Sequence, residues 1–480
     1  MIKELVGALG TEAAGEALSA LCSVAKTKAG REEIEKELSG RGILYDLVRS
    51  SSPKVRKNAY RLIGALQKPS DMKEMEEALK REETLFAVPS LLLALGNLGA
   101  EEAVRSYEVP VSAGPDTDKH IALIASAKNK ALERFENSER EPVSRLEQPS
   151  EILCFAPKGF GKELRGELGK LGFPGKTEGD AVRIITDDIG KVYRADSMVE
   201  ALLPIRKNVL LDPAAIAAAA GGCEGKRYRI ELRGYLKNRS GFIEKLKDKL
   251  SGVNSPSNYD WELRIECRND TADLYWKLWN VPDKRYPWRE NTIPASIHPA
   301  TASALALYAK RFTEDAPVSV IDPFSGSGSL LFACEKALDC KALLGVDISG
   351  KAVEAARKNA KAGTSRAKFV CKDILRFTVR SGSDLVISNL PFGNRVGSHR
   401  ENETLYAGFV SKLPYLLNES GTAVLYTAEW HLLGEVIEKN RKLRLISSFQ
   451  TEAGGLYPRV FVIQKARDAN KSIKTMEDLS

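Results

Sequence analysis

Residues that build metal centres and disulfide frameworks are scarce in this sequence. Its 480 residues include four histidines, and the seven cysteines are scattered, odd in number and without a Cys-x-x-Cys pair. This scarcity argues against a histidine-built metal site, a zinc cluster and a disulfide scaffold, and scattered free thiols fit a reducing compartment. We therefore expect a cytoplasmic protein that holds no metal.

Long apolar runs and a strong charge imbalance are also absent. No apolar run approaches the ~18–20 residues of a transmembrane helix, so we expect no membrane segment. The first residues, which include Glu4, Glu12 and Glu16, do not look like a signal peptide. The net charge of +8 is compatible with a polyanionic partner but does not identify one. Because single domains usually run ~100–200 residues, the length predicts two to four domains.

Apolar residues at helical spacing mark residues 1–140. In one stretch they recur at steps of three and four: Val55, Ala59, Leu62, Ile63 and Leu66. A second helix is predicted at 86–96, and the sequences Gly64-Ala65-Leu66 and Gly96-Asn97-Leu98 lie 32 residues apart. This spacing resembles HEAT-type helical repeats, whose paired helices stack and share a core. An irregular helical bundle is the alternative.

The pattern changes after a polar, proline-bearing linker at 141–150. Short strands are predicted at 152–156 and 182–185, with helices at 161–171 and from 192 onward. Such alternation is typical of a small α+β domain.

From about residue 286 the alternation of strands and helices becomes regular. Apolar strands are predicted at 318–321, 342–346, 368–370, 384–387 and 422–426, and helices between them at 330–336 and 351–359. Apolar strands separated by helices predict a parallel, doubly wound, Rossmann-like sheet that is covered on both faces.

A glycine-rich turn, Ser325-Gly326-Ser327-Gly328, follows the first of these strands and opens a helix. Glycines there let the backbone approach a ligand at the carboxyl edge of the sheet. Asp322 could receive the ammonium group of a methionine moiety, although an Asp-Pro pair also forms turns. By itself the turn could equally serve a dinucleotide or no ligand. The sequence contains no G-x-x-x-x-G-K-[ST] segment, which argues against a nucleoside triphosphatase.

Two further aspartates fall at the ends of the next predicted strands. Asp347 could accept hydrogen bonds from both ribose hydroxyls, and Asp373 could accept one from an adenine amino group. Each alone could equally cap a helix, but their places at successive strand ends favour a cofactor site. Together with Ile348 and Ile374, they complete the set predicted to hold an adenosine-containing cofactor.

The segment Asn389-Leu390-Pro391-Phe392-Gly393 follows the strand that begins at Asp384. An exocyclic amine on a base is a poor nucleophile, and two oxygen acceptors, the Asn389 side chain and the carbonyl next to Pro391, could aim its lone pair at a methyl donor. Proline fixes the turn, and Phe392 offers a face on which the base could stack. Positioning would then supply most of the rate gain. A plain turn is the alternative.

Residues 285–465 resemble the methyltransferase domain of the THUMP-associated RNA guanine-N2 methyltransferases. The resemblance rests on Pro294-Ala295-Ser296-Ile297-His298-Pro299, on 322–328 and on 389–393. It implies S-adenosylmethionine as the cofactor, with Asn389, Pro391 and Phe392 as catalytic residues.

Residues 151–206 also resemble the ferredoxin-like domain that precedes THUMP in this family. The similar segments are Phe155-Ala156-Pro157-Lys158-Gly159-Phe160 and Val192-Tyr193-Arg194-Ala195-Asp196. Residues 207–285 occupy the THUMP position. The resemblance implies an RNA-binding module at 151–285 and a methyltransferase domain at 286–468. The helical repeats predicted at 1–140 are not part of the usual layout of this family.

Basic residues gather at 226–249, where aromatic side chains are interleaved with them. Such a stretch suits contacts to RNA phosphates, and a solvated surface is the alternative. His298 could line the cofactor cleft or simply start a helix. Arg395, His399 and Arg400 could guide a nucleotide chain or lie in a solvated loop.

These patterns predict a methyltransferase that acts on guanosine N2 in RNA, with tRNA as the expected partner. The target base would have to be unstacked or flipped to reach Phe392. Ribosomal RNA, N6 of adenine in DNA and a protein glutamine amide are alternative targets of the same chemistry. In a different class, the chain would be an inactive adaptor built on helical repeats. The N-terminal helices are a candidate surface for a protein partner.

Overall fold

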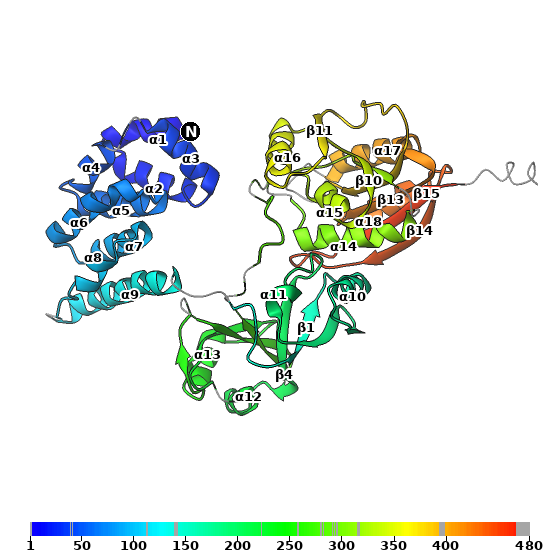
Figure 1. Cartoon of the computed structure of the whole chain (residues 1–480). Helices are drawn as coiled ribbons and strands as arrows, with labels where there is room; N and C mark the ends of the chain where they lie inside the picture. Colours follow the sequence, from blue (N-terminus) through cyan, green and yellow to red (C-terminus); the bar gives the residue numbers. More distant parts are fainter. Residues whose placement is uncertain are drawn as a thin grey trace, which may run out of the picture. The chain divides into compact units, whose positions relative to one another are not determined.

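The computed structural model describes residues 2–38, 40, 42–111, 114–138, 143–221, 223–256, 259–278, 281, 283–289, 291, 293, 296–313, 317–392 and 399–466. The chain forms two compact units (Figure 1). The first contains Met1–Glu141, Gly222–Ile230 and Lys247–Glu262, and the second contains Pro142–Gly221, Glu231–Leu246 and Leu263–Ser480.

The N-terminal part of the first unit is helical, as its apolar spacing predicts. Its α-helices are α1 (Ile2–Gly7), α2 (Ala14–Val24), α3 (Lys28–Glu37), α4 (Gly42–Val48), α5 (Pro53–Leu66), α6 (Met72–Arg81), α7 (Val88–Leu98), α8 (Glu101–Ser106) and α9 (Pro115–Ser138). Pro53 occupies the first turn of α5, where its fixed φ suits a helix start. The apolar faces share one core, which includes Leu62, Leu91 and Leu95.

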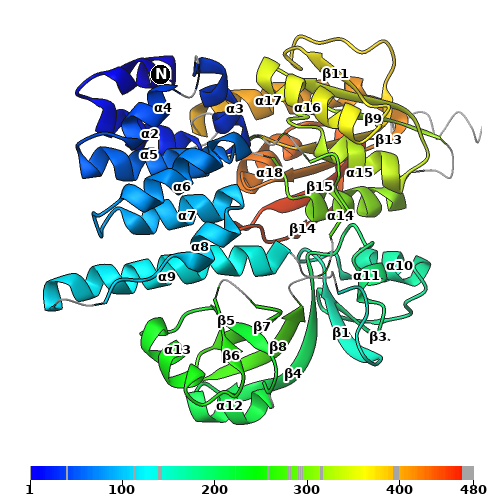
Figure 2. The same cartoon turned by 60° about the vertical axis from the view of Figure 1, so that its left-hand side comes forward.

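Helices α5, α7 and α9 pack in this order in the stack (Figure 2). The two glycines that lie 32 residues apart make equivalent contacts between them. A Cβ added to Gly64 of α5 would lie 2.7 Å from Ala94 of α7, and one added to Gly96 of α7 would lie 2.8 Å from Ala131 of α9. The Asn97 side chain donates to the Gly64 carbonyl over 3.0 Å. The missing side chains therefore let successive helices approach closely.

An eight-stranded sheet follows, with strand order β2-β3-β1-β4-β8-β7-β5-β6. Its strands are β1 (Ser150–Phe155), β2 (Lys176–Glu178), β3 (Ala181–Thr186), β4 (Glu200–Leu210), β5 (Arg227–Arg233), β6 (Val253–Asn254), β7 (Trp261–Arg268) and β8 (Thr271–Leu278). The helices of this region are α10 (Gly161–Lys170), α11 (Ile189–Val192), α12 (Pro213–Ala220) and α13 (Arg239–Lys247). β1 runs antiparallel to both β3 and β4.

The predicted helix that begins at Val192 is wrong, because α11 ends there. Asp188 caps this short helix by accepting from the Lys191 amide, so that the helix starts before the predicted position. Beyond it, the amides of Asp196 and Ser197 donate to the Glu167 carboxylate over 2.7 and 2.9 Å. These bonds hold the chain in an irregular path that a helix could not follow.

The C-terminal region contains a seven-stranded sheet with the order β11-β10-β9-β12-β13-β15-β14. Its strands are β9 (Val318–Asp322), β10 (Cys340–Asp347), β11 (Lys368–Cys371), β12 (Ser383–Asn389), β13 (Leu417–Thr427), β14 (Leu443–Gln450) and β15 (Arg459–Lys465). Its helices are α14 (Pro299–Ala309), α15 (Ser329–Ala337), α16 (Gly350–Ala362), α17 (His399–Leu416) and α18 (Trp430–Glu438). β9 to β13 are mutually parallel, as predicted.

A fully parallel sheet was the wrong prediction, because β15 runs antiparallel to both β13 and β14. Apolar runs did not predict the β14–β15 hairpin, because β14 is an edge strand whose residues are mostly exposed. Within the second unit, Phe449 of β14 contacts Phe160 and Tyr308, with ring centroids 5.3 and 5.2 Å away. The aromatic cluster thus joins the region of β1–β3 to the seven-stranded sheet.

Candidate active site

The carboxyl ends of β9, β10 and β12 meet at one edge of the seven-stranded sheet. β9 lies between β10 and β12 and is parallel to both. Asp322, Asp347 and Asn389 are the last residues of these strands, so the fold brings all three to this edge. Ligands of open α/β sheets bind at such edges.

The glycine turn between β9 and α15 requires its glycines. Gly326 and Gly328 have φ values of 51° and 89°, in the left-handed region that favours glycine. A Cβ on Gly328 would also lie 2.8 Å from the Phe332 ring. The turn is fixed further by a 2.8 Å hydrogen bond between the hydroxyls of Ser296 and Ser327. The Ser325 hydroxyl is buried without a hydrogen-bond partner among the described residues.

Asp347 lies against this turn, as predicted for a shared site. One carboxylate oxygen accepts from the Gly326 amide over 2.9 Å, and the other accepts from the Ser349 amide over 2.8 Å. Each oxygen of an ionised carboxylate can accept more than one hydrogen bond, so ribose hydroxyls could still be received. The neighbouring Ile348 side chain is 74% exposed, which leaves an apolar surface at the sheet edge.

Asp322 is almost completely buried beneath the turn. Its carboxylate accepts from the Ser388 hydroxyl over 2.6 Å and from the Phe324 amide over 3.1 Å. Burial raises the pKa of Asp322 to about 7, and the nearby charge of Asp347 acts in the same direction. Ser388, which sequence reasoning missed, connects the turn to β12 beside Asn389.

Asp373 lies two residues beyond β11, and its carboxylate accepts from the Leu375 amide over 2.9 Å. This local bond closes a turn and does not cap a helix, because no described helix begins directly after Asp373. Ile374 is buried, in contrast to Ile348. A contact of Asp373 with adenine therefore stays a prediction.

The last residue of β12 carries an acceptor that has no partner in the described part of the chain. The Asn389 side-chain oxygen is buried and has no hydrogen-bond partner among the described residues. Buried polar atoms usually find partners, so such an atom at a sheet edge is a candidate for a ligand contact. Pro391 and Phe392 are half-buried beside it.

Tyr406 and Thr427, which sequence reasoning missed, help to hold this segment in place. The Tyr406 hydroxyl donates to the Pro391 carbonyl over 2.8 Å, and it is 2.7 Å from the Thr427 hydroxyl. The Leu390 amide also donates to the Tyr426 carbonyl on β13 over 2.9 Å. No local sequence pattern marks Tyr406, because it is one apolar-face residue of α17.

Of the other predicted residues, one has a structural role and several lie outside the described part of the chain. The imidazole of His298 accepts from the Ala300 amide and caps α14, and burial lowers its pKa, which supports the structural alternative. Gly393 and Arg395 lie outside the described residues, as do Pro294, Ala295 and the side chains of His399 and Arg400.

The basic stretch at 226–249 has fewer arginines available for RNA phosphates than its local sequence indicates. Three of its arginines form ion pairs with acids outside the stretch, which the local count of charges missed: Arg227 with Asp260, Arg229 with Glu262, and Arg233 with Glu200. Among the described residues, no group of three or more His, Cys, Asp or Glu side chains could hold a metal ion. No described helix combines the length and the apolar character needed to span a membrane.

The residues at this edge fit S-adenosylmethionine. A glycine turn with positive φ values at Gly326 and Gly328, a buried carboxyl at Asp322 and a carboxylate at Asp347 could receive its amino-acid and ribose ends. The exposed Ile348 would be covered by an adenine ring.

Parts of this chain are similar to known proteins. The family described as UPF0020: RMKL-like, methyltransferase domain matches residues 287–459. A tRNA (guanine(6)-N2)-methyltransferase of Thermus thermophilus is 30% identical over 210 residues, which cover 42% of this chain and 60% of that protein. Its counterpart in Methanocaldococcus jannaschii is 31% identical over 124 residues, covering 25% of this chain and 32% of that one. The chain thus spans about a third to three fifths of these relatives.

Solved structures share the fold. TrmN from Thermus thermophilus has a TM-score of 0.51 at 22% identity, with 66% of this chain and 99% of that chain covered. A putative methyltransferase complexed with SAH, SMU.472, has a TM-score of 0.52 at 15% identity, with 67% and 100% covered. The expected resemblance is confirmed: residues 287–459 match the model of the RMKL-like UPF0020 methyltransferase domain, and part of the chain is similar to tRNA guanine-N2 methyltransferases.

Proposed function

We propose that this protein transfers a methyl group from S-adenosylmethionine to the exocyclic N2 of a guanosine in tRNA. The proposal depends above all on the buried side-chain oxygen of Asn389, which has no hydrogen-bond partner among the residues that the structure describes. This oxygen lies one residue from Ser388, whose hydroxyl binds Asp322 beneath the glycine turn. The candidate amine acceptor and the candidate cofactor residues are therefore neighbours. The names of the tRNA methyltransferases that resemble the chain support the choice of substrate.

The chain's own residues would bind and orient the cofactor. Asp322 would receive the ammonium group, the amides of the glycine turn would approach the methionine carboxylate, and Asp347 would accept from the ribose hydroxyls. When bound, S-adenosylmethionine supplies a methyl group on a cationic sulfur. Asp373 and Ile374 would lie near the adenine, which Ile348 would cover.

Asn389 would act on the guanine amine. Its side-chain oxygen and the Leu390 carbonyl would each accept one N–H, which aims the nitrogen lone pair at the methyl carbon. A nitrogen–carbon bond forms as the carbon–sulfur bond breaks, and the surplus proton on N2 leaves to solvent. Asn389 cannot take up this proton, so its contribution is positioning, together with stacking of the base on Phe392.

The finer organisation belongs to the same proposal. We infer HEAT-like repeats at 1–140, a ferredoxin-like and THUMP-like module at 151–285 and the catalytic domain at 286–468, in a cytoplasmic protein. The equivalent glycine contacts of Gly64 and Gly96 support the repeats. The N-terminal helices would then offer a surface to a protein partner.

Transfer of a labelled methyl group to separated tRNA, rRNA, DNA and protein fractions tests this function. We expect label in tRNA as N2-methylguanosine. Asn389→Ala should lower transfer at least a hundredfold while the cofactor dissociation constant changes less than twofold, because only the amine loses its acceptor. Asn418→Ala, which alters an asparagine at the other end of the parallel β12–β13 pair, is the control. Label in another fraction, or equal loss of binding and transfer, would contradict the proposal.

A further inference from the structure

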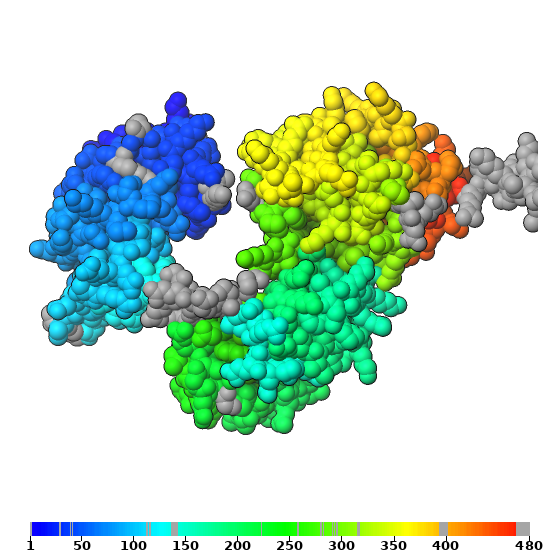
Figure 3. Space-filling model, in the orientation of Figure 1, coloured from blue at the N-terminus to red at the C-terminus, as the bar shows by residue number. Residues whose placement is uncertain are grey.

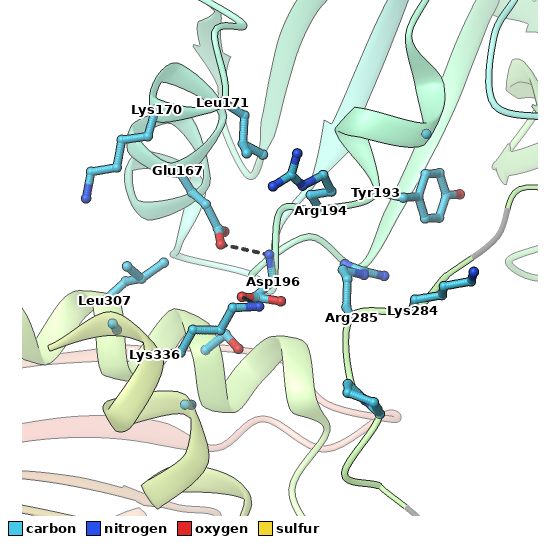
Figure 4. Close-up of a pocket in the computed structure, with 15 residues that line it drawn as sticks. Glu167, Lys170, Leu171, Tyr193, Arg194, Asp196, Lys284, Arg285, Leu307 and Lys336 are labelled. Carbon is cyan, nitrogen blue, oxygen red and sulfur yellow. Dashed lines mark hydrogen bonds and ion pairs between the residues drawn. The ribbon is translucent and has the colours of Figure 1, made fainter. Parts of the chain in front are cut away.

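A polar cavity of about 680 Å³ lies within the second unit, away from the site described above. Figure 4 shows its lining, which comes from α10, from the turn after α11, from the segment around Lys284 and from α14 and α15. In Figure 3, the surface of the β1–β3 region adjoins that of the C-terminal domain. The volume is in the range of ordinary ligand pockets.

The two acids that line the cavity, Glu167 and Asp196, already bind other groups of the protein. The Glu167 carboxylate accepts from the amides of Asp196 and Ser197, and also from the Ser197 hydroxyl over 2.6 Å. The Asp196 carboxylate pairs with Lys336 over 2.5 Å. Arg285 is likewise matched, because it pairs with Asp283 over 2.6 Å. Glu167 and Asp196 are therefore not available to neutralise a further cation.

Three other cations around the cavity are uncompensated. Lys170, Arg194 and Lys284 come from three separate elements, and all three are exposed. None of their side chains has a hydrogen bond or ion pair to another described residue. A hollow lined by three such cations, whose acids already pair with other groups, attracts an anion.

The position of the cavity relates it to the methyl-transfer site. α15 begins beside Gly328 of the cofactor turn, and its far end supplies Lys336 and Ala337 to the cavity. At 1.5 Å per residue, this helix separates the two sites by about 12 Å. α14, which supplies Ser303 and Leu307, starts next to the Ser296 that binds the turn. A nucleic-acid chain could therefore reach from one site to the other.

We propose that the cavity binds phosphate groups of the substrate RNA, next to the nucleotide that is methylated, through Arg194, Lys284 and Lys170. This inference rests on the proposed function, because it takes RNA as the polyanion. The three cations hold the chain at a fixed distance from Asn389, and they recognise the backbone rather than the base sequence.

Salt dependence of RNA binding tests the inference. The full-length double variant Arg194→Ala/Lys284→Ala should bind tRNA about tenfold more weakly at 0.1 M salt. The slope of log K against log salt should become less steep by about 1.4 to 1.8, since each lost phosphate contact removes about 0.7 to 0.9. Its affinity for S-adenosylmethionine should be unchanged. The matched control is Lys439→Ala/Arg444→Ala, which removes two exposed cations outside the cavity and should leave the slope unchanged.

The outcomes separate this inference from the proposed function. If wild-type protein methylates tRNA but the double variant keeps the wild-type slope, or if the control variant loses as much, the cavity is not an RNA site. The same conclusion follows if calorimetry shows binding of inorganic phosphate or guanosine monophosphate in the cavity while tRNA affinity is insensitive to Arg194 and Lys284. If wild-type protein methylates no RNA at all, the proposed function itself fails.

Discussion

The Tyr406 hydroxyl on α17 donates a 2.8 Å hydrogen bond to the Pro391 carbonyl, in the turn that follows Asn389. Tyr406 is completely buried, and its oxygen is 2.7 Å from the Thr427 hydroxyl, which in turn accepts from the Glu429 amide. A directed chain of hydrogen bonds thus runs from the end of β13 to the candidate catalytic turn. Tyr406 touches the turn rather than the reacting atoms, so it is a positioning residue.

Replacing Tyr406 by Phe should slow methyl transfer without weakening cofactor binding. The change removes one buried hydrogen bond to Pro391, worth about 1 to 2 kcal/mol, which corresponds to a five- to thirtyfold lower kcat if it is spent on positioning. Single-turnover transfer and calorimetry measure the two quantities. Tyr415→Phe, on an exposed tyrosine of the same helix, is the control and should have little effect. An unchanged kcat for Tyr406→Phe would remove its positioning role.

Replacing Asp347 by Ala should weaken cofactor binding first. The variant frees the Gly326 amide and removes the acceptor for the ribose, and hydrogen bonds to a charged group are worth about 1.5 to 3 kcal/mol. We expect a dissociation constant about 10- to 100-fold higher by calorimetry. Asp339→Ala, at the opposite end of β10, should bind the cofactor normally. Normal binding by Asp347→Ala would place the ribose elsewhere.

Cofactor binding should tighten as the pH rises towards 7. The pKa of Asp322 is raised to about 7 by burial, so below that pH the carboxyl is neutral and attracts an ammonium group only weakly. Affinity should increase by up to about tenfold per pH unit between pH 5 and 7 and then level off, with release of a proton on binding. Calorimetry in buffers of different ionisation enthalpy measures this release.

The same carboxyl acts on stability with the opposite sign. Because its pKa is higher in the folded protein than in the unfolded chain, its contribution to stability is present at acidic pH and is lost as the pH rises through about 7. In Asp322→Asn both pH dependences should disappear. A pH profile of cofactor affinity that is identical in wild type and in this variant would exclude Asp322 as the titrating group.

Replacing Gly96 by Ala should destabilise the helical region. The new Cβ would lie 2.8 Å from the Ala131 Cβ, so α7 and α9 would have to separate. Overpacking of this kind costs about 1 to 3 kcal/mol, which exceeds the gain of up to about 1 kcal/mol in helix propensity. Urea unfolding followed by circular dichroism checks the sign. Gly15→Ala in α2, where the nearest atom would lie 3.8 Å away, should be neutral or stabilising.

Part of the site was predictable because it depends on local chemistry. Strand ends, a glycine turn and an Asn-Leu-Pro-Phe segment are visible in the sequence, and the parallel topology brings them to one edge. The β14–β15 hairpin was missed because an exposed edge strand lacks an apolar run. The charge of 226–249 was overestimated, since Glu262 and Asp260, far along the chain, neutralise two of its arginines.

The amino-acid sequence by itself determined three features: the helical N-terminal region, the alternation of strands and helices, and the aspartates that end β9 and β10. These features follow from periodicity and turn chemistry within a few residues. Tertiary structure decided that Asp322 is buried, that Tyr406 fixes Pro391, and that Lys170, Arg194 and Lys284 line one cavity. Burial and contacts between distant residues have no local pattern, because they arise only when separate elements pack together.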